Sequence, residues 1–253
     1  MHIFHKVDLP KLAPLFAHNR YDKVILYSIL EGYHGTAMAD SLDDPKVARL
    51  DSGSHTILGG DPTHPAAEAL LLARPMGIVT PENDEWRQLL HRTFNGSISQ
   101  IDFTECYSNT IKVHHLDDFI NMLPSSYKIQ PIDRHIAEQI AKDQDNEYFL
   151  EHFESVNDFL VRGIGFCILN NEQIVSVATS IAACQHAIDI EIKTSPDYQR
   201  TGLGTIIGAS LVKGCLEKDI DPKWLAANDR SCRLAEKLGY TRGEQYISFM
   251  IGD

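Results

Sequence analysis

Two closely spaced glycines, Gly202 and Gly204, mark the segment of this chain whose residue types and spacing most clearly indicate a ligand site. They end the run Gln199–Gly204, which reads QRTGLG. Glycine removes side chains where a main chain must approach a ligand closely. The first N–H groups of a helix have no partners within the helix, and the helix dipole is positive at that end, so phosphate is a favoured ligand there. Arg200 could add a positive charge and Thr205 a hydroxyl donor. We therefore expect an anion site at the start of a helix.

This segment differs from two other phosphate-binding patterns. It lacks the lysine of the nucleotide motif G-x-x-x-x-G-K-[ST], and it departs from the dinucleotide motif G-x-G-x-x-G. A glycine pair at a helix start can also serve only to make a tight turn. The neighbouring elements favour the ligand site, because a strictly alternating strand, Ala187–Lys193, precedes the glycines and an apolar helical pattern follows them.

The elements that must position this segment follow a regular order from residue 127 to residue 251. They are predicted as a strand at 127–132, a helix after Asp133, a helix at 148–160, strands at 165–169, 174–182 and 187–193, a helix from 203, a strand at 224–227, a helix at 231–238 and a strand at 246–251. This order predicts an α/β (α+β) fold.

The first half of the chain is predicted to be a separate mixed α/β domain of unclear role. Val24–Leu30 and His55–Leu58 are strand candidates, and Leu123–Ser126 is the best boundary, which gives domains 1–125 and 126–253. No clear internal repeat is evident. Two interpretations stay open for the first domain: it is a diverged relative of the second, or it is a lid that shapes an acceptor site.

Two segments resemble the signature motifs of the GNAT acetyltransferase superfamily. The first is Glu191–Gly204, EIKTSPDYQRTGLG, and the second is Trp224–Tyr240, WLAANDRSCRLAEKLGY. In the second, an Asn follows a strand and a helix ends in K-x-G-Y. Its form also resembles the zwittermicin A resistance acetyltransferases, which carry an N-terminal extension of similar length. The GNAT resemblance covers about residues 127 to 251.

The resemblance implies a C-terminal GNAT fold, with a mixed, splayed central sheet flanked by helices. Two neighbouring strands separate, and the pantetheine arm of acetyl-CoA lies in the gap. The implied cofactor-binding residues are Ile192, Lys193 and Thr194 for the arm, Gln199, Arg200, Thr201, Gly202, Leu203, Gly204 and Thr205 for the pyrophosphate, and Asn228 and Ser231 on the second wall. Asn228 could instead be an ordinary helix cap.

Acetyl transfer to an amine needs a base. An amine with a pKa near ~10.4 is neutral in only about one molecule in a few thousand at pH 7. Asp189 and Glu191 are two residues apart on a predicted strand and so share a face. Either could be the general base, although a bulge could change which one faces the substrate, and the pair could simply face solvent. His186 is a lesser candidate.

The residue that would assist the leaving thiolate is not obvious. Many GNAT enzymes use a tyrosine five residues before the aromatic of K-x-G-F/Y, and this chain has Ala235 there. Tyr240, Tyr246 or a water could replace it, or the thiolate could leave unaided because a thiol pKa is only about 8.5. The remaining alternative is a module that binds CoA without turnover.

Composition limits the classes of molecule that the chain is expected to bind. The chain has 253 residues and a net charge of −12, which disfavours nucleic acid and anionic membranes and favours cationic ligands. Five cysteines without a CxxC pair indicate neither a disulfide framework nor a metal site, and no signal peptide or membrane span is evident. We expect a cytoplasmic N-acetyltransferase for a small, cationic amine, for example an antibiotic, with a protein amine as the alternative acceptor. The sequence does not indicate the oligomeric state.

Overall fold

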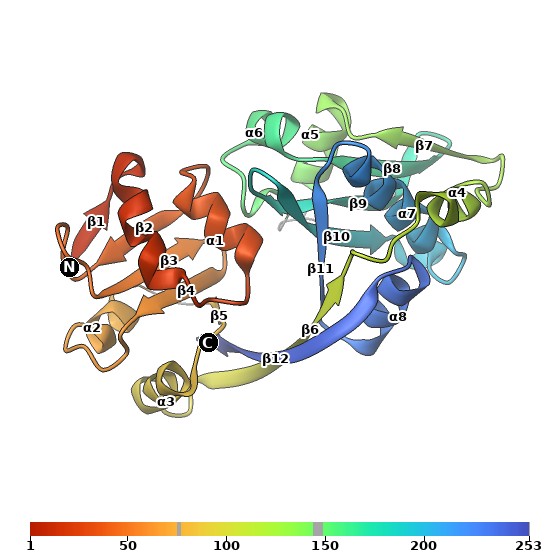
Figure 1. Cartoon of the computed structure of the whole chain (residues 1–253). Helices are drawn as coiled ribbons and strands as arrows, with labels where there is room; N and C mark the ends of the chain where they lie inside the picture. Colours follow the sequence, from red (N-terminus) through yellow and green to blue (C-terminus); the bar gives the residue numbers. More distant parts are fainter. Residues whose placement is uncertain (75–76, 144–148, 253) are drawn as a thin grey trace. The chain divides into compact units, whose positions relative to one another are not determined.

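The computed structural model describes residues 1–74, 77–143 and 149–252 (Figure 1). The chain forms two compact units, which are described separately. One comprises Met1–Phe103 together with Tyr246–Asp253, and the other comprises Thr104–Gln245. The boundary predicted between residues 125 and 126 falls inside the second unit, after helix α4 (Val113–Ile120).

The first unit is a mixed sheet with helices. Its elements are β1 (His2–Phe4), η1 (Lys6–Phe16), α1 (Lys23–Leu30), β2 (Thr36–Ala39), β3 (Val47–Ser52), β4 (His55–Gly60), α2 (Ala67–Leu72), β5 (Ile78–Val79) and α3 (Asp84–Thr93). The strand order is β1-β2-β3-β4-β5, followed by the end of β12 (Thr241–Ile251), and β4 and β5 are parallel. The prediction of a strand at Val24–Leu30 was wrong, because this segment forms helix α1.

The second unit carries the predicted element order. Besides α4 and the end of β6 (Ile98–Tyr107), it contains β7 (Tyr127–Pro131), α5 (Arg134–Lys142), α6 (Val156–Arg162), β8 (Gly165–Asn170), β9 (Gln173–Ala183), β10 (Ala187–Thr194), η3 (Pro196–Tyr198), α7 (Leu203–Leu216), β11 (Asp221–Ala226) and α8 (Asp229–Lys237). The strand order is β6-β11-β10-β9-β8-β7, in which only β10 and β11 are parallel. The predicted mixed sheet flanked by helices is confirmed.

One predicted helix in this unit begins later than expected. Of the helix predicted at 148–160, Tyr148 lies outside the described residues, and α6 starts only at Val156. The hydroxyl of Ser155 accepts a hydrogen bond from the backbone N–H of Asp158, which is the geometry of an N-cap.

The two halves of the chain repeat one another in element order. Each runs strand, two helical segments, three strands, helix, strand, helix, strand, with α4 as the connection between the repeats. The last strands of the two repeats, β6 and β12, are exchanged. The end of β12 pairs with β5 through Phe249 and Val79, and the end of β6 pairs with β11 through Cys106 and Trp224. The first half of the chain therefore supplies a strand to the unit formed mostly by the second half.

Helix α7 lies at the centre of the second unit because it is apolar on nearly every side. Its buried residues run almost without a break from Leu203 to Cys215, as expected for a helix covered all round. It packs against β8–β11 and beside α4, where Lys213 forms an ion pair with Asp117 (Figure 1). This packing fixes the start of α7 beside the end of β10.

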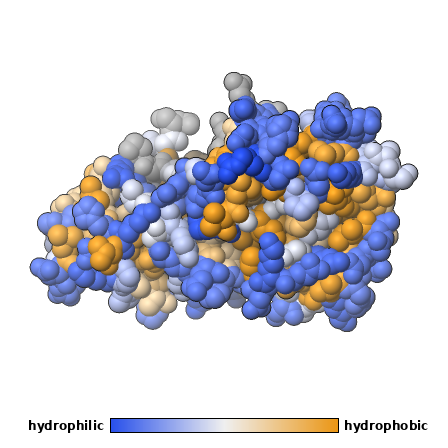
Figure 2. All heavy atoms as spheres, turned by 90° about the horizontal axis from the view of Figure 1, so that it is seen from above, coloured by the Kyte–Doolittle hydropathy of each residue, from blue (hydrophilic) through white to orange (hydrophobic). Residues whose placement is uncertain are grey.

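The surface shown in Figure 2 mixes hydrophilic residues with smaller hydrophobic areas. Single exposed apolar side chains occur in both units, such as Val7 and Val161. Within the residues described, no helix combines the length and apolarity needed to cross a membrane. All five cysteines are free thiols, and four of them are buried.

Candidate functional site

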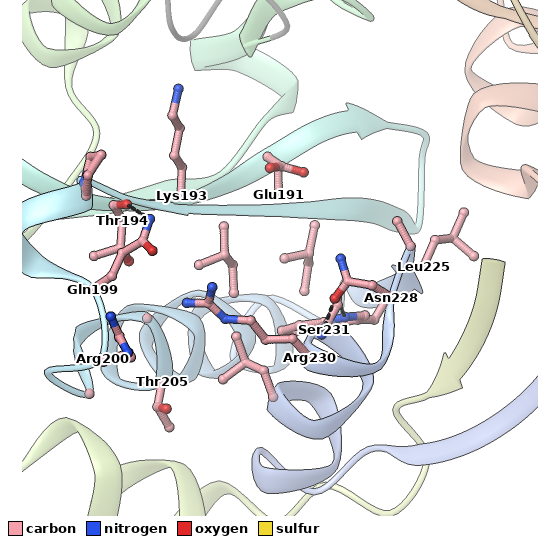
Figure 3. A pocket seen from close by; sticks show the side chains of 18 residues that line it. Glu191, Lys193, Thr194, Gln199, Arg200, Thr205, Leu225, Asn228, Arg230 and Ser231 are labelled. Atoms are coloured by element: carbon pink, nitrogen blue, oxygen red, sulfur yellow. Dashed lines mark hydrogen bonds between the residues drawn. The ribbon is translucent and has the colours of Figure 1, made fainter. Parts of the chain in front are cut away.

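A cleft opens in the second unit where β10 and β11 separate (Figure 3). The two strands pair over Ala187–Asp189 and Asp221–Lys223, and in the described chain their pairing ends there. Beyond that point lies a cavity of about 740 Å³. Its walls are formed by Ile190, Glu191, Ile192, Lys193, Thr194, Pro196, Gln199, Arg200, Gly202, Gly204, Thr205, Trp224, Leu225, Ala227, Asn228, Arg230, Ser231 and Leu234.

The glycine segment forms one end of this cleft. Arg200 and Gly202 adopt left-handed backbone conformations, with φ of 61° and 90°. Such turns present successive N–H groups to an anion. A Cβ atom built on Gly202 meets no atom within 4 Å, and one built on Gly204 meets only the Thr194 hydroxyl oxygen at 3.5 Å. Side chains at either glycine would therefore occupy open space that a ligand could fill.

Other predicted residues of this segment have supporting positions. The amide of Gln199 donates to the carbonyl of Thr194 at 3.1 Å and thereby closes the loop. The Thr201 hydroxyl donates to the carbonyl of Tyr198, and Thr201 is not a wall residue. Leu203 is buried in the core. The side chains of Thr201 and Leu203 thus shape the loop, and only their backbone could contact a ligand.

The cleft is positively charged in an otherwise acidic chain. Lys193, Arg200 and Arg230 line it, whereas Glu191 is the one acidic residue among the described wall residues. Neither Arg200 nor Arg230 forms an ion pair within the part of the chain that the structure describes. Sequence reasoning missed Arg230, although its place two residues after Asn228, in the first turn of α8, was a usable signal.

The second wall is built from the start of α8. The Asn228 side-chain oxygen accepts from the Ser231 backbone N–H at 3.0 Å, so Asn228 is a helix cap and a wall residue at once. The Ser231 hydroxyl oxygen accepts from the Trp224 indole N–H, also at 3.0 Å. The helix-cap alternative for Asn228 is confirmed, and its contact with a cofactor stays a prediction.

Of the two candidate bases, only Glu191 lines the cleft. Asp189 is 8% exposed and lies before the strands separate. The bulge at this point leaves Ile181 of β9 without a partner in the register, so β10 itself keeps its alternation. Glu191 and Lys193 accordingly project from the same side of β10 (Figure 3). His186 is exposed at the start of β10 and is not a wall residue.

The environment of Glu191 suits a base. Solvent reaches its side chain, although the surrounding protein partly desolvates the carboxyl. This burial raises the pKa of the carboxyl above its ordinary value, and the positive charge of Lys193 partly opposes the effect.

The tyrosines considered as acids are not placed for that role. The Tyr240 hydroxyl donates to the carbonyl of Pro222 at 2.8 Å, and burial raises its pKa well above the ordinary value. Tyr246 belongs to the first unit, where its ring stacks on Tyr21, and it is not a wall residue. Ala235 is fully buried.

Comparison with known proteins accords with this geometry. The sequence profile of the GNAT acetyltransferase family matches residues 13–249, nearly the whole chain. This protein belongs to the GNAT acetyltransferase family. The match includes the first half, which the sequence motifs alone left unassigned. The narrower resemblance to zwittermicin A resistance acetyltransferases stays a prediction.

Relatives of this GNAT protein support the assignment. The Bacillus subtilis (strain 168) protein YdfB, named as an uncharacterised N-acetyltransferase, is 29% identical over 132 residues, which are 51% of this chain and 50% of that protein. The chain thus spans about half the length of this curated relative. A GCN5-related N-acetyltransferase-like protein from Streptococcus suis 89/1591 is 27% identical, with a TM-score of 0.85 over 97% of this chain and 98% of its own.

A second solved structure bears on the repeat. A tandem GNAT protein from the clavulanic acid biosynthesis pathway has a TM-score of 0.63 at 11% identity, covering 97% of this chain and 94% of its own. At that identity the likeness concerns the fold alone. It agrees with the repeated element order of the two units.

Proposed function

We propose that this GNAT protein transfers an acetyl group from acetyl-CoA to the nitrogen of a small-molecule amine. The observation that carries the proposal is a cationic cleft at a strand separation, with two glycines that border open space at one end and a carboxylate on its wall. Family membership adds the chemistry, because GNAT proteins use acetyl-CoA as co-substrate.

The residues present fit this co-substrate. The backbone of Ile192–Thr194 borders the cleft and could pair with the amides of the pantetheine arm. The N–H groups of Arg200–Gly204 would hold the pyrophosphate, aided by the helix dipole of α7 and by the Arg200 side chain, because those of Gln199 and Thr205 already donate to backbone carbonyls. Arg230 would add a second charge to the phosphates. Acetyl-CoA, once bound, supplies an acetyl group activated as a thioester.

Glu191 would take the proton that the acceptor amine must lose. Glu191 lines the cleft, so it could accept this proton directly or through one water. Its raised pKa makes it a stronger base than an ordinary carboxylate. We assign Asp189 no direct role, since it is buried away from the cavity.

Acidic residues of a second cavity favour a cationic acceptor. A second cavity of about 350 Å³ shares Lys193 and Pro196 with the first, and the side chains of Asp143 and Glu172 help to line it. A second positive group on the acceptor could be neutralised there. Amines with and without such a group, antibiotics and a peptide amine included, should be compared by release of free CoA thiol.

Titration calorimetry with acetyl-CoA tests the binding step. Gly204→Glu places a carboxylate in the open space of the cleft without demanding a left-handed backbone. We expect the wild-type protein to bind and this variant to lose binding by at least about 100-fold, because the new charge repels the phosphates at close range. Lys218→Glu, at an exposed position two residues beyond the end of α7, is the control and should bind normally. Failure of the wild-type protein to bind would refute the proposal.

Arg200 and Arg230 provide a second prediction. Arg200→Gln and Arg230→Gln should each weaken acetyl-CoA binding by about 10-fold, since each removes a charge-assisted contact to phosphate. The loss should shrink as salt is added, because salt already screens these charges in the wild-type protein. Arg233→Gln is the control, since Arg233 pairs with Asp229 outside the cleft. Equal losses in all three variants would contradict the assigned contacts.

A further inference from the structure

We infer that Ser231, oriented by Trp224, donates a hydrogen bond to the CoA sulfur as the thiolate leaves, in place of the tyrosine that this chain lacks. The inference rests on the proposed function. It assigns a role in the reaction to a hydroxyl that sequence reasoning had grouped with general cofactor contacts.

Ser231 is the hydroxyl that α8 presents to the cleft. It precedes Ala235 by one helical turn, and residues four apart lie on the same side of a helix. Ala235 is fully buried in the core formed with Cys232 and Leu238. Ser231 lies on the cavity wall instead. The hydroxyl that α8 offers to the cleft therefore comes from Ser231, one turn before the position of the family's usual tyrosine.

Trp224 sets the direction in which this hydroxyl can donate. The Trp224 indole N–H donates to the Ser231 oxygen at 3.0 Å and so occupies one of its acceptor sites. Trp224 is 5% exposed, and its ring packs edge-on against Tyr240. The hydroxyl hydrogen of Ser231 meets no acceptor among the described residues, which leaves it free to donate into the cleft.

The position along the cleft matches the reacting end. Gln199, Arg200 and Thr205 lie at the phosphate end, whereas Ser231, Asn228 and Leu225 lie toward the other end, across from Glu191 (Figure 3). An extended ligand with its phosphates on α7 therefore brings its sulfur toward Glu191 and Ser231.

The surroundings favour negative charge on that sulfur. Ser231 is in the first turn of α8, where the helix dipole is positive. The acidic residue in that turn, Asp229, is neutralised by Arg233 and Arg242, each at 2.7 Å. The charged groups that face the cavity are Glu191 and Lys193 from β10, Arg200 from the loop and Arg230 from α8.

The step balances without a further reactant. The acceptor nitrogen bonds to the acetyl carbon, the carbon–sulfur bond breaks and its electron pair passes to sulfur, while the proton of the amine goes to Glu191. Ser231 donates a hydrogen bond to the resulting thiolate and keeps its own proton. Solvent later protonates the thiolate or carries it away.

The decisive measurement is the pKa of the CoA thiol when bound to the protein. It is followed by the ultraviolet absorbance of the thiolate, with the desulfo-CoA complex as the blank. In the wild-type protein we expect this pKa to lie below the ordinary thiol value of about 8.5. In Ser231→Ala it should rise by about one pH unit, because a hydrogen bond to a charged group is lost. Ser231→Thr should restore most of the shift, and Trp224→Phe should give an intermediate value.

Steady-state kinetics complete the test. Ser231→Ala should lower kcat by about 10- to 100-fold with little change in the KM for acetyl-CoA. Ser210→Ala, a buried serine of α7 bonded to the carbonyl of Ile206, is the matched control and should leave both quantities unchanged. The inference would be overturned if the pKa of the bound thiol were the same in Ser231→Ala as in the wild-type protein, even if kcat fell. Absence of CoA binding by the wild-type protein would instead overturn the proposed function.

Discussion

Glu191→Gln is expected to lower kcat by about 100- to 10,000-fold while acetyl-CoA still binds, because the amide cannot accept the proton of the acceptor amine. The substitution preserves size, and Glu191 is exposed to the cleft and not packed in the core, so the fold should be unaffected. Asp189→Asn is the paired variant. It should lower kcat far less, since Asp189 does not line the cavity.

The pH dependence of the same reaction has a defined sign. Glu191 acts as a base only when ionised, and burial raises the pKa of its carboxyl. The rate should therefore fall, as the pH is lowered, at a higher pH than an ordinary glutamate value of about 4.3 would predict. Lys193→Met should move this limb to still higher pH, because Lys193 lowers the pKa of Glu191. Rates measured with a fixed, saturating acceptor would show this, and an acid limb that persists in Glu191→Gln would exclude Glu191 as the base.

The place of the cleft could be predicted from sequence because its determinants are local. The alternation at Ala187–Lys193 defines a two-faced strand, and the glycines that follow allow the left-handed turn observed at Gly202. Both signals lie within one stretch of chain, and the structure places most of that stretch around the cleft. The choice between Asp189 and Glu191 could not be made from spacing, because it depends on where β11 leaves β10.

The errors come from residues whose environment is set by distant parts of the chain. Val24–Leu30 is apolar almost throughout, and α1 is buried on several sides, so neither the helical nor the strand period stands out. Its conformation therefore depends on the segments of the chain that pack against it. The repeat of the two units was equally hidden, since element order recurs without evident sequence similarity.

The exchanged strands were beyond sequence reasoning for a related reason. Alternating residues predict that β6 and β12 are strands but do not name their partners. Pairing of Cys106 with Trp224 joins residues more than a hundred positions apart. This is also why the sequence boundary at residue 125 separates β6 and α4 from the unit that contains them.

That exchange leads to the second large expected effect: a fragment of residues 126–253 should neither unfold cooperatively nor bind acetyl-CoA. It lacks the end of β6, so the outer edge of β11 at Trp224–Ala226 has no partner strand. It also lacks α4, whose fully buried Leu116 covers α7 and α8. Each large apolar side chain contributes about 1.5–3 kcal/mol when buried. The loss of several, with the strand pairing, approaches the total stability of about 5–15 kcal/mol typical of a native protein.

A longer fragment separates this cause from mere truncation. Residues 104–253 restore β6 beyond Phe103 together with α4, and with them the contacts of Thr110 to the Gly239 carbonyl and of His115 to the Lys237 carbonyl. We expect this fragment to recover a cooperative thermal transition and measurable acetyl-CoA binding. Wild-type affinity in the 126–253 fragment would show that the exchanged segment is dispensable. Binding by 104–253 but not by 126–253 would show that the cleft depends on the donated strand and helix.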